Sequence, residues 1–411
     1  MTIFLLACLA IYVAWNLGAN DVANSMGTSV GSKAITLTQA IVIAGILEFS
    51  GAVIFGRQVS STIASDVVNP ELFASQPQVF VTGMIAVLIS CGLWLQIATS
   101  QGLPVASSHA VVGAIAGFSW IAMGKNAVDW GNIGIISLGW LATPILGGAI
   151  AITIYSILSR SLFDTKSLVK LQEWIPWLSA GLVAIFGTIV FPQFWQAAFL
   201  KGLNLPSHDL SLALGGVATL GVTTYGWQQL KIFKSKDNLA LEAVMGKFQV
   251  ISACFVAFAH GSNDVGNAIA PLAAIVYVSN TNAIPFGNIP IPTWVLVVGG
   301  LGIVAGLAIQ GKKVIATVGE NIISLVPSTG FCAEIATATT ILLASRIGLP
   351  VSTSHTLVGS IVGIGLWKNR ASVDWSTVRS ILLAWIVTLP SAAILGAIVF
   401  QILSYLGSLQ F

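Results

Sequence analysis

Twelve apolar segments make up most of the chain and restrict the folds that it can adopt. Only 8% of the 411 residues are charged and 56% are hydrophobic, whereas roughly a quarter of an ordinary soluble domain is charged. Most segments reach or approach the ~20 residues that a membrane-spanning helix needs. We therefore predict an all-α polytopic membrane protein with segments near residues 3–18, 35–56, 79–98, 105–123, 131–158, 177–200, 210–230, 248–278, 294–310, 331–345, 351–367 and 377–405.

The lysines and arginines are distributed unevenly between the loops. If successive loops alternate sides, thirteen basic residues face one side and four face the other. The positive-inside rule then places the loops at 159–176 and 231–247 in the cytoplasm and both termini outside. We expect an integral protein of the bacterial inner (plasma) membrane, surrounded by the lipid bilayer. The net charge of +3 is small and spread over loops, so no nucleic-acid partner is expected.

One polar box occurs twice within the apolar segments. The pattern Asn-Asp-x-x-Asn stands at residues 20–24 and again 243 residues later, at 263–267 (263 − 20 = 243). We expect each box at the end of an apolar helix. Its members are Asn20, Asp21, Asn24, Asn263, Asp264 and Asn267.

An aspartate within a membrane-spanning segment costs roughly 2.5–3.5 kcal/mol on insertion scales, so two at matching places indicate a functional site. Carboxylate and carboxamide oxygens suit a hard cation such as Na⁺, and a carboxylate alone can carry a proton. The alternative interpretation is an Asn–Asp hydrogen bond that packs two helices together.

A second repeated box follows the same plan. Gly-Leu-Pro begins both residues 102–109 and residues 348–355, at an offset of 246 (348 − 102 = 246). Proline and glycine predict a break in the helix. Hydroxyl side chains then stand at a helix N-terminus, where free N–H groups and the helix dipole favour an anion. These side chains are Ser107, Ser108, Thr353 and Ser354. Simple capping of the two helices is the alternative.

The repeated boxes divide the chain into two related halves. Val-Asp-Trp at residues 128–130 recurs at 373–375, and we expect a first repeat at 1–158, connecting helices and polar loops at 159–247, and a second repeat at 248–411. Seven segments separate the two Asn-Asp boxes, an odd number, which predicts inverted repeats. The number stays odd if 79–98 and 105–123 form a re-entrant hairpin. Inverted repeats with polar breaks are typical of secondary transporters.

Four further polar residues lie in apolar segments. Glu48 and Glu334 are not related by the repeat (334 − 48 = 286). Each is either a gate or coupling acid, or a carboxylate that is protonated or satisfied by helix ends. His109 and His355 follow the hydroxyl pairs, and they either relay protons or make structural hydrogen bonds.

At these motifs the chain resembles the inorganic phosphate transporter (PiT) family. The signatures of that family are a Gly-Ala-Asn-Asp-Val-Ala-Asn box in each half and a Gly-Leu-Pro-Val-Ser-Thr-x-His box. The resemblance covers both halves, and residues 26–32 and 47–51 look most similar to the cyanobacterial and chloroplast branch. The chain departs from the pattern at Ala106-Ser107, where Ser-Thr is usual, and at His260-Gly261-Ser262.

The resemblance implies two re-entrant hairpins, a homodimer and symport of inorganic phosphate with Na⁺ or H⁺. It implies a phosphate site at Ser107, Ser108, Thr353, Ser354, Asn20 and Asn263. It implies cation ligands at Asp21, Asn24, Asp264 and Asn267. Glu48 and Glu334 match acids that the family is thought to need, which implies coupling or gating.

The sequence therefore favours a cation-coupled phosphate symporter that works by alternating access, with Na⁺ preferred over H⁺. A permease for another tetrahedral oxyanion such as sulfate keeps the same fold. An anion channel differs in that it cannot drive uphill flux. An intramembrane hydrolase built on Ser108 and His109 is disfavoured, because adjacent residues on one helix do not face each other. We expect no enzyme activity and no cofactor, with Na⁺ as a co-transported ion.

Overall fold

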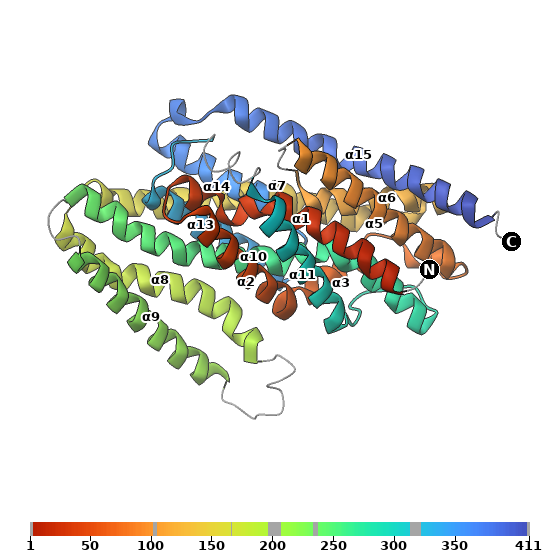
Figure 1. The fold of residues 1–411 in the computed structure, drawn as a ribbon, viewed down its shortest axis with the longest axis horizontal. Coiled ribbons are helices and arrows are strands. Elements are labelled where there is room, and N and C mark those ends of the chain that lie inside the picture. Colours follow the sequence, from red (N-terminus) through yellow and green to blue (C-terminus); the bar gives the residue numbers. More distant parts are fainter. Residues whose placement is uncertain are drawn as a thin grey trace.

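The computed structural model describes residues 3–101, 105–165, 167–195, 207–232, 237–312 and 322–408. Within these ranges it is built of helices (Figure 1), with one isolated bridge between Val68 and Val128. The α-helices are α1 (Ile3–Gly31), α2 (Leu37–Phe55), α3 (Arg57–Ser65), α4 (Pro70–Phe73), α5 (Pro77–Ser100), α6 (Ser107–Met123), α7 (Trp130–Leu158), α8 (Leu168–Trp195), α9 (Ser207–Ile232), α10 (Asp237–Thr281), α11 (Thr293–Gln310), α13 (Pro327–Arg346), α14 (Thr353–Lys368) and α15 (Trp375–Ser408).

Each of the twelve predicted apolar segments overlaps one of these helices, although α1 and α10 extend well beyond their segments. In the described part of the chain, eight helices are long and apolar enough to cross a bilayer, namely α1, α2, α5, α7, α8, α10, α11 and α15. Helix α6 is apolar but has only 17 residues. The prediction of an all-α polytopic membrane protein is confirmed.

Both Asn-Asp boxes lie inside long helices, so the prediction that they end a helix is wrong. Helix α1 continues through its box to Gly31, and α10 runs for 45 residues through the second box to Thr281. The box side chains bond to other elements and do not compete for the helix backbone, which leaves the helix intact. The predicted loop at 231–247 is also largely helical in its described residues, because α9 extends to Ile232 and α10 already begins at Asp237.

The second predicted break is present between α13 and α14. Residues 347–352 are not helical, and Gly348 has a positive φ of 72° that side chains with a Cβ rarely adopt. The matching Gly-Leu-Pro of the first repeat, residues 102–104, lies outside the described residues. The described helices on either side of it, α5 and α6, form a pair equivalent to α13 and α14.

Helices of the two halves pack in matching pairs. Helix α1 packs on α11 as α10 packs on α2, and α6 packs on α15 as α14 packs on α7. All four pairs join a helix of one half to a helix of the other. Glycines allow these crossings, because a Cβ at Gly117 would overlap the backbone of Ala393 and one at Gly363 would lie 2.8 Å from the carbonyl oxygen of Gly148.

The repeated Val-Asp-Trp motif starts the long helices α7 and α15. Asp129 accepts a hydrogen bond from the N–H of Asn132 (3.0 Å). Asp374 accepts one from the N–H of Ser376 (2.9 Å). A carboxylate at this position satisfies N–H groups that have no partner within the helix.

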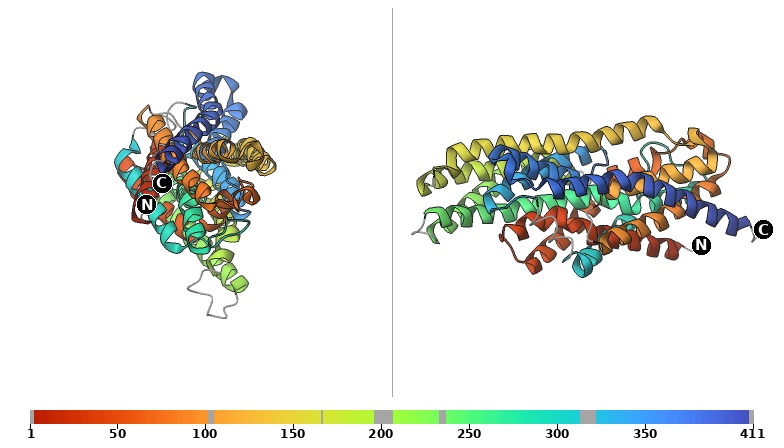
Figure 2. Two further views of the ribbon diagram at one scale, coloured as in Figure 1. Left: turned by 90° about the vertical axis from the view of Figure 1, so that its right-hand side faces the viewer. Right: turned by 90° about the horizontal axis from the view of Figure 1, so that it is seen from above.

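Both chain ends lie at the same end of the elongated bundle, and the junction between α7 and α8 lies at the opposite end (Figures 1 and 2). Helices α8 and α9 pack on each other and project from the side of the bundle. Long α10 passes through the middle and contacts helices of both halves. The Asn-Asp boxes therefore meet at the centre of the bundle.

Candidate functional site

The site is built where α1 and α10 meet the N-termini of α6 and α14. All six box residues are at most 3% exposed. Asn24 of the first half donates to Thr353 Oγ1 at the start of α14 (3.4 Å). Asn267 of the second half donates to Ser107 Oγ at the start of α6 (3.2 Å). These two contacts are related by the repeat, and we call them the clasps. Each joins an Asn-Asp box to the helix of the other half that begins with hydroxyl side chains, which we call a hydroxyl helix.

The first asparagine of each box holds the loop of its own half. The Asn20 amide donates to Thr99 Oγ1 (3.2 Å) and accepts from the N–H of Val105 (3.3 Å). Asn263 has equivalent partners in the second half, the hydroxyl of Ser345 (2.9 Å) and the main chain of Val351 (3.3 Å). Thr99 and Ser345 were not among the predicted site residues, although they are themselves repeat partners (345 − 99 = 246).

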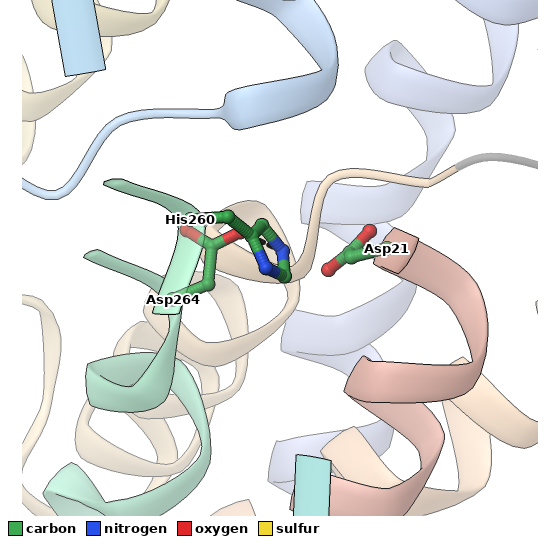
Figure 3. A group of neighbouring side chains, drawn as sticks. All are labelled: Asp21, His260 and Asp264. Atoms are coloured by element: carbon green, nitrogen blue, oxygen red, sulfur yellow. Dashed lines mark ion pairs between the residues drawn. The ribbon is translucent and has the colours of Figure 1, made fainter. Parts of the chain in front are cut away.

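The two aspartates face each other across His260 (Figure 3). Ligand atoms of Asp21, His260 and Asp264 all lie within 4.8 Å of one another. The Nε2 atom of His260 is 2.9 Å from Asp264 Oδ2, and both side chains are buried. Two carboxylates at this separation in a protein interior repel each other strongly. The arrangement is suited to binding cations.

Several polar atoms at the site have no protein partner among the described residues, although they are buried. They include Asp21 Oδ2, Ser108 Oγ and Asn267 Oδ1. The ring nitrogens of His260 make ion-pair contacts but no hydrogen bond of good geometry to a described residue. Buried polar atoms are nearly always hydrogen-bonded, so a group of such atoms in one place indicates a bound ligand or water. Carboxylate, hydroxyl and carboxamide oxygens together can coordinate a cation. The hydroxyl can also donate a hydrogen bond to an oxyanion.

The two hydroxyl helices begin differently. Ser352 caps α14 by accepting from the N–H of His355 (3.2 Å), and its own Oγ is 3.0 Å from that of Ser354. Ala106 takes the same position before α6 and offers no side-chain cap. Among the described residues, the first turn of α6 therefore keeps its N–H groups without a side-chain acceptor, and such groups favour an anion.

The two predicted coupling acids each occupy a separate polar cluster. Glu48 accepts from Ser25 Oγ (2.7 Å) and its Oε2 lies 3.3 Å from His260 Nδ1, so it stands directly behind the site. Glu334 lies elsewhere and is surrounded by four donors. They are Thr28 (2.6 Å), Ser29 (2.7 Å), Gln249 (3.0 Å) and Ser252 (2.5 Å).

His109 and His355 lie together behind the hydroxyls, in a symmetric aromatic cluster. Their Nδ1 atoms are each 3.2 Å from a main-chain carbonyl of the opposite half, that of Trp385 for His109 and that of Trp140 for His355. Their rings are in edge contact with a centroid distance of 4.7 Å. These contacts fit the structural alternative, since they join the two halves.

Sequence reasoning missed His260, which was noted as a departure from a motif and not as a site residue. Its repeat partner is Leu17 (260 − 243 = 17), so a search for matching polar residues passes over it. The signal that was available is a histidine within an apolar segment, four residues before an aspartate and therefore on the same helix face.

A bundle of membrane-length helices in two matching halves, with a buried site for ions at their junction, defines a polytopic membrane transport protein. Comparison with known proteins agrees. A model described as the phosphate transporter family matches residues 17–396. The chain belongs to the phosphate transporter family. It is a transporter and not an enzyme, and it is an integral multi-pass membrane protein that transports phosphate.

Similar proteins extend over the whole length. A "Putative phosphate permease" from Haemophilus influenzae is 39% identical over 98% of this chain and 96% of its own. The "Inorganic phosphate transporter 2-1, chloroplastic" from Arabidopsis thaliana is 38% identical over 94% of this chain and 70% of its own. A solved structure titled "The sodium-dependent phosphate transporter" is similar with a TM-score of 0.90, at 37% identity, over 98% of this chain and 100% of that one.

Proposed function

We propose that this protein is a symporter that couples the inward movement of phosphate to Na⁺ by alternating access. The observation that carries the proposal is the pair of matching clasps, Asn24 to Thr353 and Asn267 to Ser107. They bring two carboxylates within 4.8 Å of each other and place hydroxyl helices from both halves beside them. Two buried negative charges need cations, and an anion can approach them only when those cations are present.

Phosphate would bind at the N-termini of α6 and α14. Ser107, Ser108, Thr353 and Ser354 offer hydroxyls from two directions, and the uncapped first turn of α6 adds main-chain N–H groups. Asn20 and Asn263 border this cradle and hold the Val105 and Val351 loops that enter it. The Ser108 hydroxyl, which has no partner among the described residues, is available to the ligand.

The cations would bind to the oxygens of Asp21, Asn24, Asp264 and Asn267. Carboxylate and carboxamide oxygens are hard ligands that suit Na⁺, and the name of the similar solved structure supports Na⁺ over H⁺. A divalent anion that moves inward against an inside-negative potential costs about 4.6 kcal/mol per 100 mV, at ~2.3 kcal/mol per unit charge. At least two Na⁺ ions per phosphate are therefore needed for electroneutral uptake.

Glu48 and Glu334 would act in coupling or gating. Glu48 contacts His260, which contacts the cation ligand Asp264, so a change at the site is transmitted to α2. Glu334 links α13 to α1 and α10 through four hydrogen bonds, and these must break if the helices move apart. Both acids are fully buried.

Alternating access would follow from the inverted repeats, in which one half moves relative to the other around a fixed site. The family resemblance also carries the proposal that the protein is a homodimer in the bacterial plasma membrane. Cross-linking of single-cysteine variants in native membranes tests the homodimer, since a dimer gives a band at twice the monomer mass and a monomer does not.

The test of the function is uptake of radiolabelled phosphate into proteoliposomes with an imposed inward Na⁺ or H⁺ gradient. We expect uphill accumulation under the Na⁺ gradient, lost in Asp21→Asn and Asp264→Asn. The matched control is Asp164→Asn, since Asp164 is a surface carboxylate that contacts Ser159. Accumulation under the H⁺ gradient alone would replace Na⁺ by H⁺. Simple equilibration would indicate a channel, and uptake of sulfate without phosphate would indicate another oxyanion permease.

A further inference from the structure

The two halves match in backbone but differ in charge immediately behind the aspartates. A Cβ at Gly18 would overlap the backbone of Ile303, and a Cβ at Gly261 would overlap the backbone of Glu48. The two glycines are repeat partners (261 − 18 = 243), so Glu48 and Ile303 take the same place on their respective helices (303 − 48 = 255).

A second pair of crossings gives the same offset. A Cβ at Gly51 would overlap the backbone of Phe258, and one at Gly306 would overlap that of Trp15. The offset is again 243 between α1 and α10, which carry the boxes (258 − 15), and 255 between α2 and α11, which cross them (306 − 51). The buried pair His260 and Glu48, which lies behind Asp264, therefore corresponds to the buried pair Leu17 and Ile303, which lies behind Asp21. Each pair takes one residue from each half.

The aspartates consequently have different surroundings. Asp264 Oδ2 is in contact with two groups, since His260 Nε2 lies 2.9 Å away and Thr353 Oγ1 donates to it at 2.9 Å. Asp21 Oδ1 accepts from Asn24 at 3.2 Å, and the Ser107 hydroxyl, the repeat partner of Thr353, also interacts with this carboxylate. No histidine contacts it from its own helix, where Leu17 takes the place of His260. Asp21 Oδ2 has no hydrogen-bond partner in the described part of the chain. Asp264 Oδ1 accepts from the side-chain amide of Asn263 (3.2 Å). Asp21 therefore offers one oxygen without a partner in the described part of the chain, whereas both oxygens of Asp264 have partners.

The imidazole is held in place from behind. Glu48 Oε2 lies 3.3 Å from His260 Nδ1, and Glu48 Oε1 accepts from Ser25 Oγ at 2.7 Å. Helix α2 packs closely on α10 here, as the contact of Gly261 with the Glu48 backbone requires. His260 is therefore fully buried between two carboxylate neighbours, and a rotation of its ring would break both contacts.

We propose that His260, positioned by Glu48, makes the two cation sites unequal in affinity, so that Na⁺ binds more tightly at Asp21 than at Asp264. This inference rests on the proposed Na⁺ coupling. A Na⁺ ion at Asp21 uses the free oxygen at no loss of a protein contact. A Na⁺ ion at Asp264 displaces the imidazole or the Thr353 hydroxyl from Oδ2, or the Asn263 amide from Oδ1. His260 and Glu48 are positioning residues that act through Asp264.

The test is equilibrium binding of ²²Na⁺ to the purified full-length protein. The wild type should bind Na⁺ in two steps, of which Asp21→Asn removes the tighter and Asp264→Asn the weaker. The double variant E48I/H260L places behind Asp264 the same apolar pair that Leu17 and Ile303 form behind Asp21. It should tighten the weaker step at least fivefold and leave the tighter step within twofold of the wild type.

Replacing a buried charged pair by apolar residues is often tolerated, whereas removing one member leaves the other unpaired. Both residues are therefore changed together. If E48I/H260L does not fold, E48Q/H260Q keeps polar groups at both positions and should tighten the weaker step by a smaller factor. Leu17→Ile is the matched control, because it alters only apolar packing at the partner position, and both of its binding steps should match those of the wild type.

Two equal binding steps in the wild type would overturn the inference. A folded double variant with both affinities unchanged would do the same. If the wild type neither binds ²²Na⁺ nor accumulates phosphate under a Na⁺ gradient, the proposed coupling itself fails and the inference falls with it. If Na⁺ drives uptake but the two affinities are equal, only the inference fails.

Discussion

Replacement of Asp21 by asparagine isolates the charge of one carboxylate. The change is isosteric and keeps an oxygen that can accept from Asn24, as Asp21 Oδ1 does. The other oxygen, which has no partner among the described residues, becomes an NH₂ group. Two unit charges 4.8 Å apart repel by about 3.5 kcal/mol at an effective dielectric constant of about 20. Asp21→Asn removes that repulsion without creating a cavity.

Without Na⁺, the variant should therefore be more stable than the wild type by about 3.5 kcal/mol. At about 2.1 cal/mol/K per residue for the entropy of unfolding, this is a rise of about 4 °C in the melting temperature of 411 residues. With Na⁺ at 100 times its Kd, each occupied site adds about 2.7 kcal/mol. The variant has lost one site, so the difference between the proteins should shrink by that amount, or about 3 °C.

The assay is thermal unfolding in detergent, followed by tryptophan fluorescence, in NaCl and in choline chloride of equal ionic strength. Asp164→Asn serves as the control for loss of a carboxylate at the surface and should melt as the wild type does in both salts. A variant at Asp21 that melts below the wild type without Na⁺, and that gains as much from Na⁺ as the wild type, would refute the electrostatic reasoning.

Further variants test the two clasps, the close helix crossings at glycines, and Glu334. Asn24→Ala and Asn267→Ala each remove one of two matching contacts, so each should lower phosphate uptake in proteoliposomes by about tenfold, or roughly 1.4 kcal/mol, and to a similar extent. Gly117→Ala should destabilise the protein by about 1–3 kcal/mol in thermal unfolding because its Cβ meets the backbone of α15. Gly134→Ala meets nothing within 4 Å and should stabilise by about 0.5–1 kcal/mol. Glu334→Gln presents an NH₂ group to four donors and should lower uptake at least tenfold, about 1.4 kcal/mol, while the purified protein still binds ²²Na⁺.

The repeated boxes allowed much of the site to be predicted from the sequence. A matching offset at Asn20 and Asn263, and again at Ser107 and Thr353, showed that the two halves share one plan, and the structure brings these residues together. The fold class followed from the apolar segments. The prediction that Asp21 stands at a helix end was wrong, because helix continuity depends on where the polar side chains find partners, and those partners lie far away in the sequence.

Sequence reasoning missed candidate functional residues whose repeat partner is not a similar polar residue. His260 corresponds to Leu17, so comparison of the halves removed it from consideration. Gln249 and Ser252 are ordinary polar residues on a long helix, and only tertiary contact shows that both reach Glu334. Glu48 was identified as a buried acid, but its connection to the site through His260 depends on the crossing of α2 and α10.

The departures from symmetry share one property. Each buried charged group that breaks the repeat has an apolar partner, as Glu48 has Ile303, His260 has Leu17 and Glu334 has Leu88 (334 − 246 = 88). In an inverted repeat, exchanging the conformations of the halves converts an outward-open state into an inward-open one. Identical halves would give these two states equal free energy.

A buried carboxylate in one half and a leucine in the other make that exchange unequal, because a charge must keep its partners or pay several kcal/mol of desolvation. In the proposed symporter, the gradients of Na⁺ and phosphate would still decide the direction of net flux. Under the proposed alternating access, Glu48, His260 and Glu334 would determine which state has the lower free energy without ligands. The matching helix packing of the two halves would keep the other state close in free energy.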